Sequence, residues 1–190
     1  MDTTERLIAE RGMTVSLREI AAGAGQRNNS APIYHFGNYD NLLKATLDRR
    51  MRGLEQRRQE MLSELDARGD VRLADILRAI VEPALEIPYR DGATHYARFV
   101  EQIRTHPLIS QAVPAGERWP AVMALTQCLR SHMPDVERGG FTRRVRLMIT
   151  TMFVLMADYE RRGDLNSPRG RKRAGEELIA ILSAVLTATV

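Results

Sequence analysis

Two short segments decide the fold: SLREIAAGAG at residues 16–25 and SAPIYHFG at residues 30–37. Ser16 with Glu19 three residues later is the pattern of a capping box, in which the hydroxyl and the carboxylate each bind a backbone N–H at a helix start. Gly25 then ends this helix, because glycine is favoured just past a helix C-terminus. The second segment predicts another short helix over about residues 29–35, since Pro32 is tolerated only in a first turn.

Two short helices joined by a tight glycine-containing turn have the form of a helix-turn-helix. The second helix of such a motif can lie in the major groove of DNA, where side chains of its N-terminal part touch base edges. In the first helix, Leu17, Ile20 and Ala21 are predicted to face neighbouring helices. Ala21 and Ala24 are small at positions where two helix backbones have to approach closely.

The rest of the chain also predicts helices, because it contains no alternating run rich in β-branched residues. Gly, Pro and His-Pro breaks separate the predicted helices, which cover residues 5–11, 38–69, 71–87, 94–104, 121–133, 142–162 and 173–188. The breaks include Pro88, Gly139-Gly140 and 166–168. We therefore predict an all-α fold, with an N-terminal three-helix helix-turn-helix domain at residues 1–50 and a larger helical domain at residues 51–190.

Composition and charge restrict the class of protein more than they define it. A single cysteine, Cys128, excludes an internal disulfide framework and a cysteine-based zinc cage. No apolar run reaches the ~18 residues that span a bilayer, and the N-terminus lacks a signal-peptide pattern, so we expect a soluble cytoplasmic protein. The net charge of +4 is weak support for DNA binding, because residues 1–50 carry seven basic against six acidic side chains. The densest basic run is residues 161–173, of which 161–172 are predicted to form a solvated loop or, alternatively, to contact nucleic acid or an acidic partner.

The N-terminal motifs resemble those of the TetR family of repressors. The resemblance rests on AERG at residues 9–12, SLREIA at 16–21, YHFGN at 34–38 and Leu42-Leu43, and it covers about residues 5–50. It implies a ligand-responsive transcription repressor that binds double-stranded operator DNA as a homodimer. It also implies that the larger domain binds a small-molecule effector and forms the dimer contact. No cofactor, metal or membrane partner is predicted.

The residues predicted to contact DNA lie in and around the two short helices: Arg18, Gln26, Arg27, Asn28, Asn29, Ser30, Tyr34, His35 and Tyr39. Asn and Gln can pair with adenine, and Arg can bind guanine or phosphate. The resemblance implies that Arg18 meets a phosphate or a base edge and that His35 lies at the DNA backbone. Tyr39 occupies the position of the family's usual phosphate-binding lysine, and its phenol can donate a hydrogen bond to phosphate.

Four of these residues also have structural interpretations. Asn28 and Asn29 fit a polar loop that caps a helix, Tyr34 fits a half-buried core position, and Arg18 fits an ion pair on a solvated face. Two features depart from the family pattern. The turn with the recognition helix is one residue longer, and the first helix is expected to be about one turn shorter and to lack the family's basic arm.

The C-terminal part carries apolar stripes at helical spacing, which predict packing more directly than chemistry. The residues predicted for the dimer interface are Ile149, Phe153, Met156, Leu178, Ile181, Leu182 and Val185. The residues predicted to line a pocket for a largely apolar effector are Tyr96, Phe99, Trp119, Met123, Met148 and Met152, since Met-rich linings adapt to apolar ligands. Each of these side chains also fits plain core packing within one subunit.

Two other functional classes remain open at this point. An all-α enzyme would need a nucleophile–base pair or a metal cluster, and the four histidines are scattered along the chain. A helical ligand-binding or protein-binding module that has lost DNA binding would account for Tyr39 and for the shortened first helix.

Overall fold

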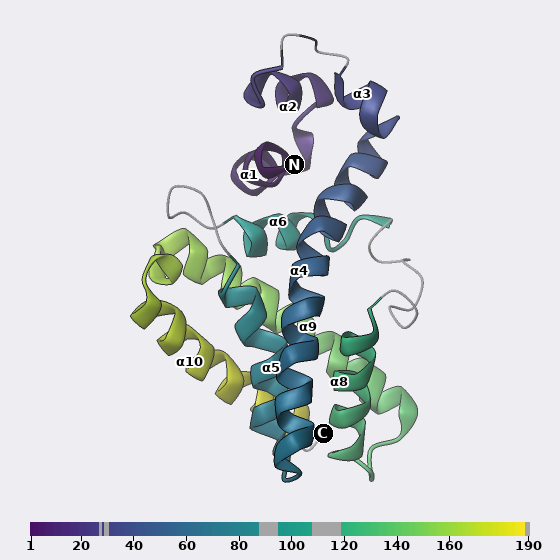
Figure 1. The fold of residues 1–190 in the computed structure, drawn as a ribbon, viewed down its shortest axis with the longest axis vertical. Coiled ribbons are helices and arrows are strands. Elements are labelled where there is room, and N and C mark those ends of the chain that lie inside the picture. The colour runs from purple at the N-terminus through teal and green to yellow at the C-terminus, as the bar shows by residue number, and fades with distance from the viewer. Residues whose placement is uncertain (27, 29–30, 88–94, 108–118, 189–190) are drawn as a thin grey trace. The chain divides into compact units, whose positions relative to one another are not determined.

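A computed structural model describes residues 1–26, 28, 31–87, 95–107 and 119–188, and every regular element among them is helical. This confirms the predicted all-α fold. Figure 1 shows the helices α1 (Asp2–Arg11), α2 (Leu17–Gly23), α3 (Ala31–Phe36), α4 (Tyr39–Arg68), α5 (Leu73–Leu85), α6 (Tyr96–Ile103), α8 (Pro120–Ser131), α9 (Arg138–Arg162) and α10 (Pro168–Thr187). Two 3₁₀ turns, η1 (Gly12–Thr14) and η3 (Asp164–Asn166), follow α1 and α9.

The chain forms two compact units. The first contains Met1–Arg52 and the described part of His95–Val113, and the second contains Gly53–Thr94 and Pro114–Val190. The first segment of this unit ends at Arg52, two residues beyond the boundary predicted at residue 50. The unit also includes α6, which lies within the predicted larger domain. Helix α4 supplies residues to both units.

Local signals explain where most helices begin and end. Gly12, with φ +76°, follows α1, and its N–H bonds Ile8 O. Asn38 Oδ1 accepts a hydrogen bond from Asn41 N at 2.8 Å and so caps the start of α4, which ends at Arg68 before Gly69 in the left-handed conformation. The predicted helix over residues 38–69 agrees with α4 to within one residue.

The break predicted at Gly139-Gly140 is wrong. Gly139 and Gly140 lie inside the first turn of α9, where Phe141 N donates to Glu137 O at 2.9 Å. A first turn has few intrahelical hydrogen bonds to lose, and burial of Phe141 offsets the cost of glycine, about 1 kcal/mol each.

Helix α10 likewise starts earlier than predicted. Ser167 Oγ accepts from Gly170 N at 3.0 Å, and Pro168 occupies the first helical position, where proline is favoured. A Cβ at Gly170, in the first turn of α10, would lie 1.8 Å from Asp164 O in η3, so only glycine fits at this position. The basic run at residues 161–173, predicted as a loop, instead spans the end of α9, η3 and the first turns of α10.

The first unit is held by a small hydrophobic cluster under the two short helices. Its buried members are Leu7, Val15, Ile20 and Leu42, and the half-buried Leu17, Phe36 and Tyr39 pack against it. Helix α6 lies beside α1 and contributes the fully buried Tyr96 and Phe99 (Figure 1). The core of this unit thus draws on residues nearly 90 positions apart in the chain.

An ion pair joins α1 to α4 beside this cluster. Glu5 is 2% exposed, and its two carboxylate oxygens accept hydrogen bonds from Arg50 Nε at 2.7 Å and Arg50 Nη2 at 3.0 Å. Asp2 lies 3.7 Å from the same guanidinium and also pairs with Arg49. A bidentate arginine–carboxylate pair of this kind fixes the geometry of the two helices as well as their separation.

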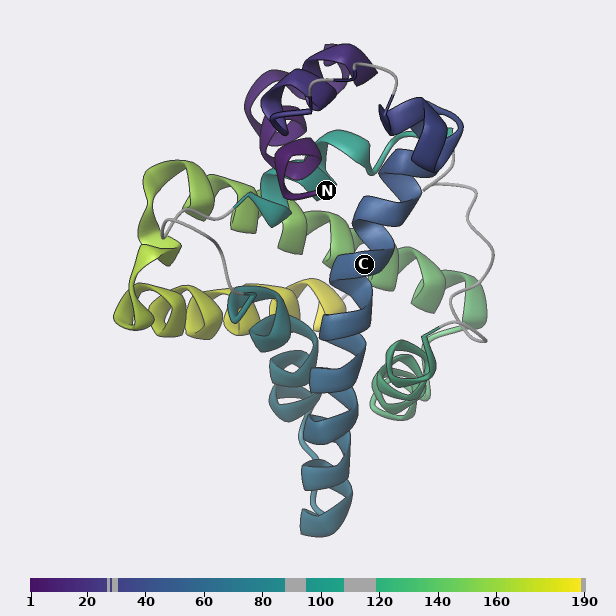
Figure 2. The ribbon, with the colours of Figure 1, turned by 45° about the horizontal axis from the view of Figure 1, so that its top comes forward.

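In the second unit α10 packs lengthwise on α5 and α9, as the views in Figures 1 and 2 agree. The two helices approach closely at Gly175, where a Cβ would lie 3.2 Å from Leu85 Cδ1. On α4, the buried Glu55 accepts a hydrogen bond from Ala121 N and so caps α8 from a different helix. Among the described residues no helix is long and apolar enough to cross a membrane.

Replacing Glu5 with Ala should destabilise the first unit by about 3 kcal/mol, because it leaves the Arg50 guanidinium in a largely buried site without its bidentate partner. Urea unfolding followed by circular dichroism measures the change. Glu10→Ala on the same helix is the matched control: Glu10 is 39% exposed and pairs with Arg6 at 3.1 Å, so its loss should cost less than about 1 kcal/mol. Equal losses in the two variants would contradict this assignment.

Candidate nucleic-acid interface

The start of α2 is fixed by the predicted capping box. Glu19 N donates to Ser16 Oγ at 3.3 Å, and Ser16 N donates to Glu19 Oε2 at 2.8 Å. Arg11 also binds the Glu19 carboxylate. The hydrogen bonds from the Ser16 backbone and hydroxyl, and then that of Arg11, lower the pKa of Glu19 to about 2. The carboxylate is therefore ionised, and it complements the positive end of the helix dipole.

The end of α2 is a Schellman motif. Gln26 N donates to Ala21 O and Gly25 N donates to Ala22 O, both at 3.0 Å. Gly25 has φ +70°, a conformation that glycine adopts without strain. This turn satisfies the last carbonyl groups of α2 and directs the chain toward α3, as the helix-turn-helix pattern requires.

The junction of α3 and α4 is equally compact. Gly37, with φ +78°, and Asn38 are the only residues between the two helices. Asn41 Nδ2 donates to Phe36 O, the last carbonyl of α3, at 2.9 Å. The sequence analysis did not identify Asn41, because an asparagine in the first turn of a helix has no distinctive pattern.

Most of the described residues predicted to contact DNA are exposed. Arg18 on α2, Gln26 and Asn28 in the turn, and Tyr34 and His35 on α3 all have exposed side chains, and Tyr34 is 86% exposed. Tyr34 is therefore not the half-buried core residue of the alternative interpretation. Its ring packs edge-on against His35, with centroids 5.4 Å apart. Arg27, Asn29 and Ser30 lie outside the described residues.

Tyr39 is placed differently from the prediction. Its ring packs on the hydrophobic cluster, and its hydroxyl is buried without a hydrogen-bond partner among the described residues. Burial raises the pKa of Tyr39. A buried hydroxyl cannot reach a phosphate in this conformation, so we leave Tyr39 out of the candidate interface. The position of Tyr39 in the sequence did not indicate that its ring packs against the hydrophobic cluster.

Close helix approach in this unit depends on Gly23 rather than on Ala24. A Cβ at Gly23 would lie 3.1 Å from Thr3 Cγ2 and 3.2 Å from Leu7 Cδ1, both on α1. Ala21 is buried, as expected, whereas Ala24 is exposed.

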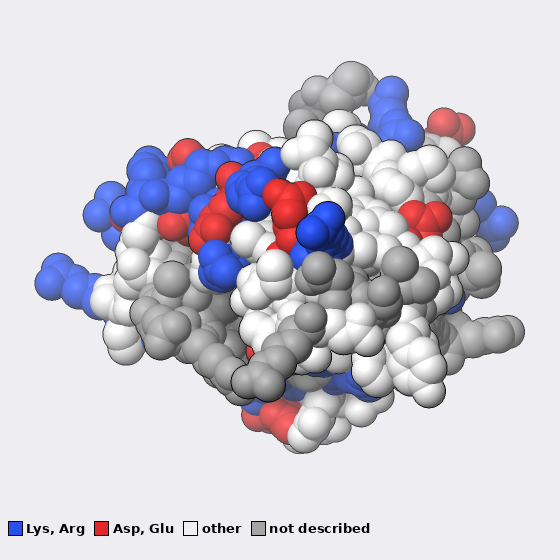
Figure 3. All heavy atoms as spheres, turned by 90° about the horizontal axis from the view of Figure 1, so that it is seen from above, with Lys and Arg blue, Asp and Glu red and all other residues white. Residues whose placement is uncertain are grey.

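Charge around the candidate interface is mixed. On the surface seen in Figure 3, acidic side chains lie among the basic ones instead of leaving a uniformly basic face. In the first unit several arginines are already paired: Arg11 with Glu19, Arg6 with Glu10, and Arg50 with Glu5. The charge of this unit therefore gives only modest support for non-specific attraction to phosphates.

The residues predicted for an effector pocket are divided between the two units. Tyr96 and Phe99 are core residues of the first unit, whereas Trp119, Met123, Met148 and Met152 belong to the second. Met148 and Met152 are 2% exposed each and Met123 is 37% exposed. Among the described residues, no group of three His, Cys, Asp or Glu side chains could hold a metal ion.

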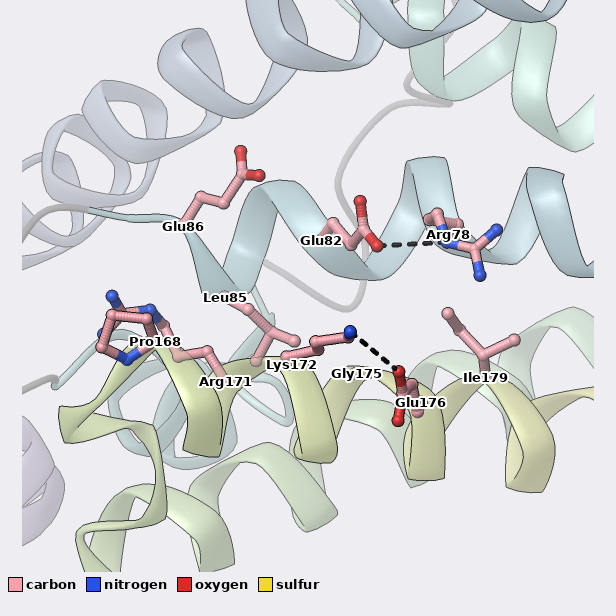
Figure 4. A pocket seen from close by; sticks show the side chains of 10 residues that line it. All are labelled: Arg78, Glu82, Leu85, Glu86, Pro168, Arg171, Lys172, Gly175, Glu176 and Ile179. Carbon is pink, nitrogen blue, oxygen red and sulfur yellow. Dashed lines mark ion pairs between the residues drawn. The ribbon is translucent and has the colours of Figure 1, made fainter.

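A cavity of about 360 Å³ lies between α5 and α10 and is lined by other residues. Figure 4 shows Glu82 and Glu86 on the α5 wall and Arg171 and Lys172 on the α10 wall, with Leu85 between them. Burial raises the pKa of Glu82 despite its ion pair with Arg78 at 3.1 Å. None of the residues predicted for the effector pocket lines this cavity.

The apolar stripes of α9 and α10 divide into buried and exposed parts. Of the residues predicted for a dimer contact, Met156, Leu178 and Leu182 are buried within the second unit, so they are core residues of one subunit. Ile149, Phe153, Ile181 and Val185 keep exposed surface. Leu147 and Val154 on α9 are also exposed, by 50% and 38%.

The capped α2, the Schellman turn and the displayed α3 together define the class of protein: a helix-turn-helix protein with a separate helical unit. The C-terminal part provides an independent comparison. Residues 78–189, more than half of the chain, match the family described as tetracyclin repressor-like, C-terminal domain. The chain therefore belongs to the TetR family of transcription regulators. No curated protein matches it.

The capping box predicts a defined pH dependence. The pKa of Glu19 is lowered from its ordinary 4.5 to about 2, so its contribution to stability is complete above about pH 4.5 and is lost as the pH falls toward 2. An NMR titration of the Glu19 carboxyl carbon should give a midpoint near 2. In Glu19→Gln the amide cannot titrate, so the pH dependence of α2 helicity in this window should become weaker. A Glu19 midpoint near 4.5 would rule out the capped carboxylate.

The different environments of Tyr39 and Tyr34 predict different effects of a tyrosine-to-phenylalanine substitution on DNA affinity. Tyr39→Phe removes a buried, unpartnered hydroxyl, so stability should stay the same or rise by up to about 1 kcal/mol, and DNA affinity should change by less than about twofold. Tyr34→Phe is the matched comparison, because it removes an exposed hydroxyl on α3 and should weaken DNA binding about three- to tenfold. Fluorescence anisotropy with a labelled duplex measures the DNA affinity of both variants, and thermal unfolding measures their stability. Weaker binding by Tyr39→Phe alone would restore Tyr39 to the interface.

Proposed function

We propose that this TetR-family chain is a ligand-responsive repressor that binds operator DNA as a homodimer. The observation that carries the proposal is the helix-turn-helix of the first unit, in which both ends of α2 and the last carbonyl of α3 have internal hydrogen-bond partners while Arg18, Tyr34 and His35 are exposed. Binding to operator DNA would place the protein in the cytoplasm, as the sequence predicted.

In the proposed complex α3 lies in the major groove and α2 lies across the DNA backbone. Arg18, in the first turn of α2, is exposed and can meet a phosphate. Gln26 and Asn28, in the turn, carry amides that can pair with a base edge or bind the sugar–phosphate backbone. Tyr34 and His35 extend the surface to the C-terminal end of α3. The displayed side chains thus include donors and acceptors for both bases and phosphates.

The proposed dimer uses the exposed apolar side of α9 with the flank of α10. Ile149 exposes 43% of its surface and lies on the same side of α9 as Phe153, four residues further along the helix. Phe153 on α9 and Val185 on α10 add partly exposed apolar area. Two helices from each subunit can form a four-helix bundle across a twofold axis, which buries these side chains. A twofold dimer would present two copies of α3 to successive turns of DNA.

The proposed effector acts by favouring one arrangement of the dimer over another. Signals can pass through the two elements at which the chain crosses between its units, α4 and the segment that carries α6. Within the first unit α6 is flanked by two histidines near acidic groups, His95 at 3.7 Å from Glu10 and His106 at 3.8 Å from Asp40. A displacement of α6 would therefore be felt at both α1 and the first turn of α4.

The proposal is tested with the DNA that lies upstream of the chain's own coding sequence. Footprinting at about 50 mM salt should show a protected site with two halves about 34 Å apart, and light scattering should show a dimer. Arg18→Ala should weaken operator binding about tenfold, because it removes a charged hydrogen bond to DNA. Arg169→Ala, an exposed arginine on α10, is the matched control and should bind like the unaltered chain.

Two results would contradict the proposed function. A chain that is strictly monomeric and shows no sequence preference at low salt would instead be a helical module that has lost DNA binding. Equal effects of Arg18→Ala and Arg169→Ala would show that any binding is carried by bulk charge, and α2 would then have no special part in it.

A further inference from the structure

The recognition helix proposed above is too short to be stable alone. Helix α3 has six residues, Ala31–Phe36, whereas isolated helices shorter than about 12 residues are marginal in water. Of the α3 side chains that the structure describes, Tyr34 and His35 are exposed, and Phe36 is half-buried against the hydrophobic cluster. The attachment of the C-terminal end of α3 therefore contributes to its orientation.

Its C-terminal end is attached by two asparagines. The Asn41 side-chain amide donates to Phe36 O at 2.9 Å, and the Asn41 backbone N–H donates to Asn38 Oδ1 at 2.8 Å. We call Phe36, Asn38 and Asn41 the α3–α4 clasp. One residue of α4 thus binds both the last carbonyl of α3 and the cap of its own helix, across a link of only two residues.

The residue type at position 41 supports a specific role for the side chain. Position 41 is the third residue of α4, where the helix dipole and the capping-box pattern favour an acidic side chain or Gln. An ionised carboxylate cannot donate to the Phe36 carbonyl, whereas the asparagine amide can. The short side chain also reaches this carbonyl past Gly37, where a Cβ would lie 3.7 Å from Asn41 Nδ2.

We propose that Asn41 is a positioning residue for DNA recognition: it holds α3 in the orientation that reads the operator, without itself being needed at the DNA. This inference rests on the proposed function. Its physical basis is preorganisation, because a recognition helix that is already held in place loses less conformational freedom on binding. Sequence-specific binding requires that orientation, whereas non-specific binding depends mainly on attraction between basic groups and phosphates.

The test compares operator DNA with a random duplex of the same length. Asn41→Ala should weaken operator binding about three- to tenfold, the usual effect of one lost hydrogen bond, and should change binding to the random duplex by less than about twofold. Asn41→Asp keeps the size of the side chain but removes the donor, so the ratio of the two affinities should fall in the same way. Repeating the comparison at higher salt, which weakens the effect of the added negative charge, separates that effect from the loss of the donor.

A second measurement follows α3 without DNA. In Asn41→Ala the backbone amides of residues 34–36 should exchange with solvent about three- to tenfold faster, while those of α2 stay unchanged. Asn38→Ala is the structural control. It removes the cap of α4 and should lower the thermal unfolding midpoint, an effect that exposed Asn41 should not show to the same extent.

The outcomes separate the inference from the proposed function. An unaltered affinity ratio and unaltered exchange in Asn41→Ala would overturn the positioning role. A ratio that falls only in step with the unfolding midpoint, as in Asn38→Ala, would also overturn it. If the unaltered chain does not distinguish operator from random DNA, the proposed function fails, and the exchange measurement still decides whether Asn41 holds α3.

Discussion

The first unit depends on a constraint that short helices impose. Helices of six, seven and ten residues cannot persist on their own propensity, so α3, α2 and α1 need tertiary contacts to exist. A small hydrophobic cluster around Leu7, Ile20 and Leu42 supplies part of this stability, and the Glu5–Arg50 pair ties α1 to α4 beside it. Everything that the unit displays on its surface depends on these few contacts.

Because the cluster is small, hydrogen bonds at the helix ends also contribute to the stability of the first unit. The capping box of α2, the Schellman turn at Gly25 and the clasp between α3 and α4 each satisfy backbone groups that would otherwise compete for water. Arg18, Tyr34 and His35 take no part in these backbone hydrogen bonds, and their side chains are exposed. Tyr39 shows the opposite case, because its ring fills the cluster and its hydroxyl is consequently buried.

Two independent lines lead to the same family. The resemblance of the N-terminal motifs covers about residues 5–50, and the family match covers residues 78–189. The two ranges do not overlap, so neither repeats the other. In the second unit, charged side chains such as Glu82 and Lys172 line a cavity between α5 and α10.

Sequence alone determined the features that depend on neighbouring residues. The cap at Ser16, the turn at Gly25 and the extent of α4 from Asn38 to Gly69 could be predicted, because each depends on hydrogen bonds or backbone conformations within a few positions. The same locality explains the errors at Gly139-Gly140, where packing of Phe141 outweighs a weak local preference against helix.

Tertiary structure alone decided which side chains are exposed and which are buried. The place of α6 in the first unit, the burial of Tyr39, and the division of the α9 stripe into buried Met156 and exposed Leu147 all depend on partners far away in the chain. An apolar residue at helical spacing shows that a face will be covered, but the pattern is the same whether a core, a second subunit or a ligand covers it. Only the packed structure distinguishes between them, because burial is a property of the whole fold.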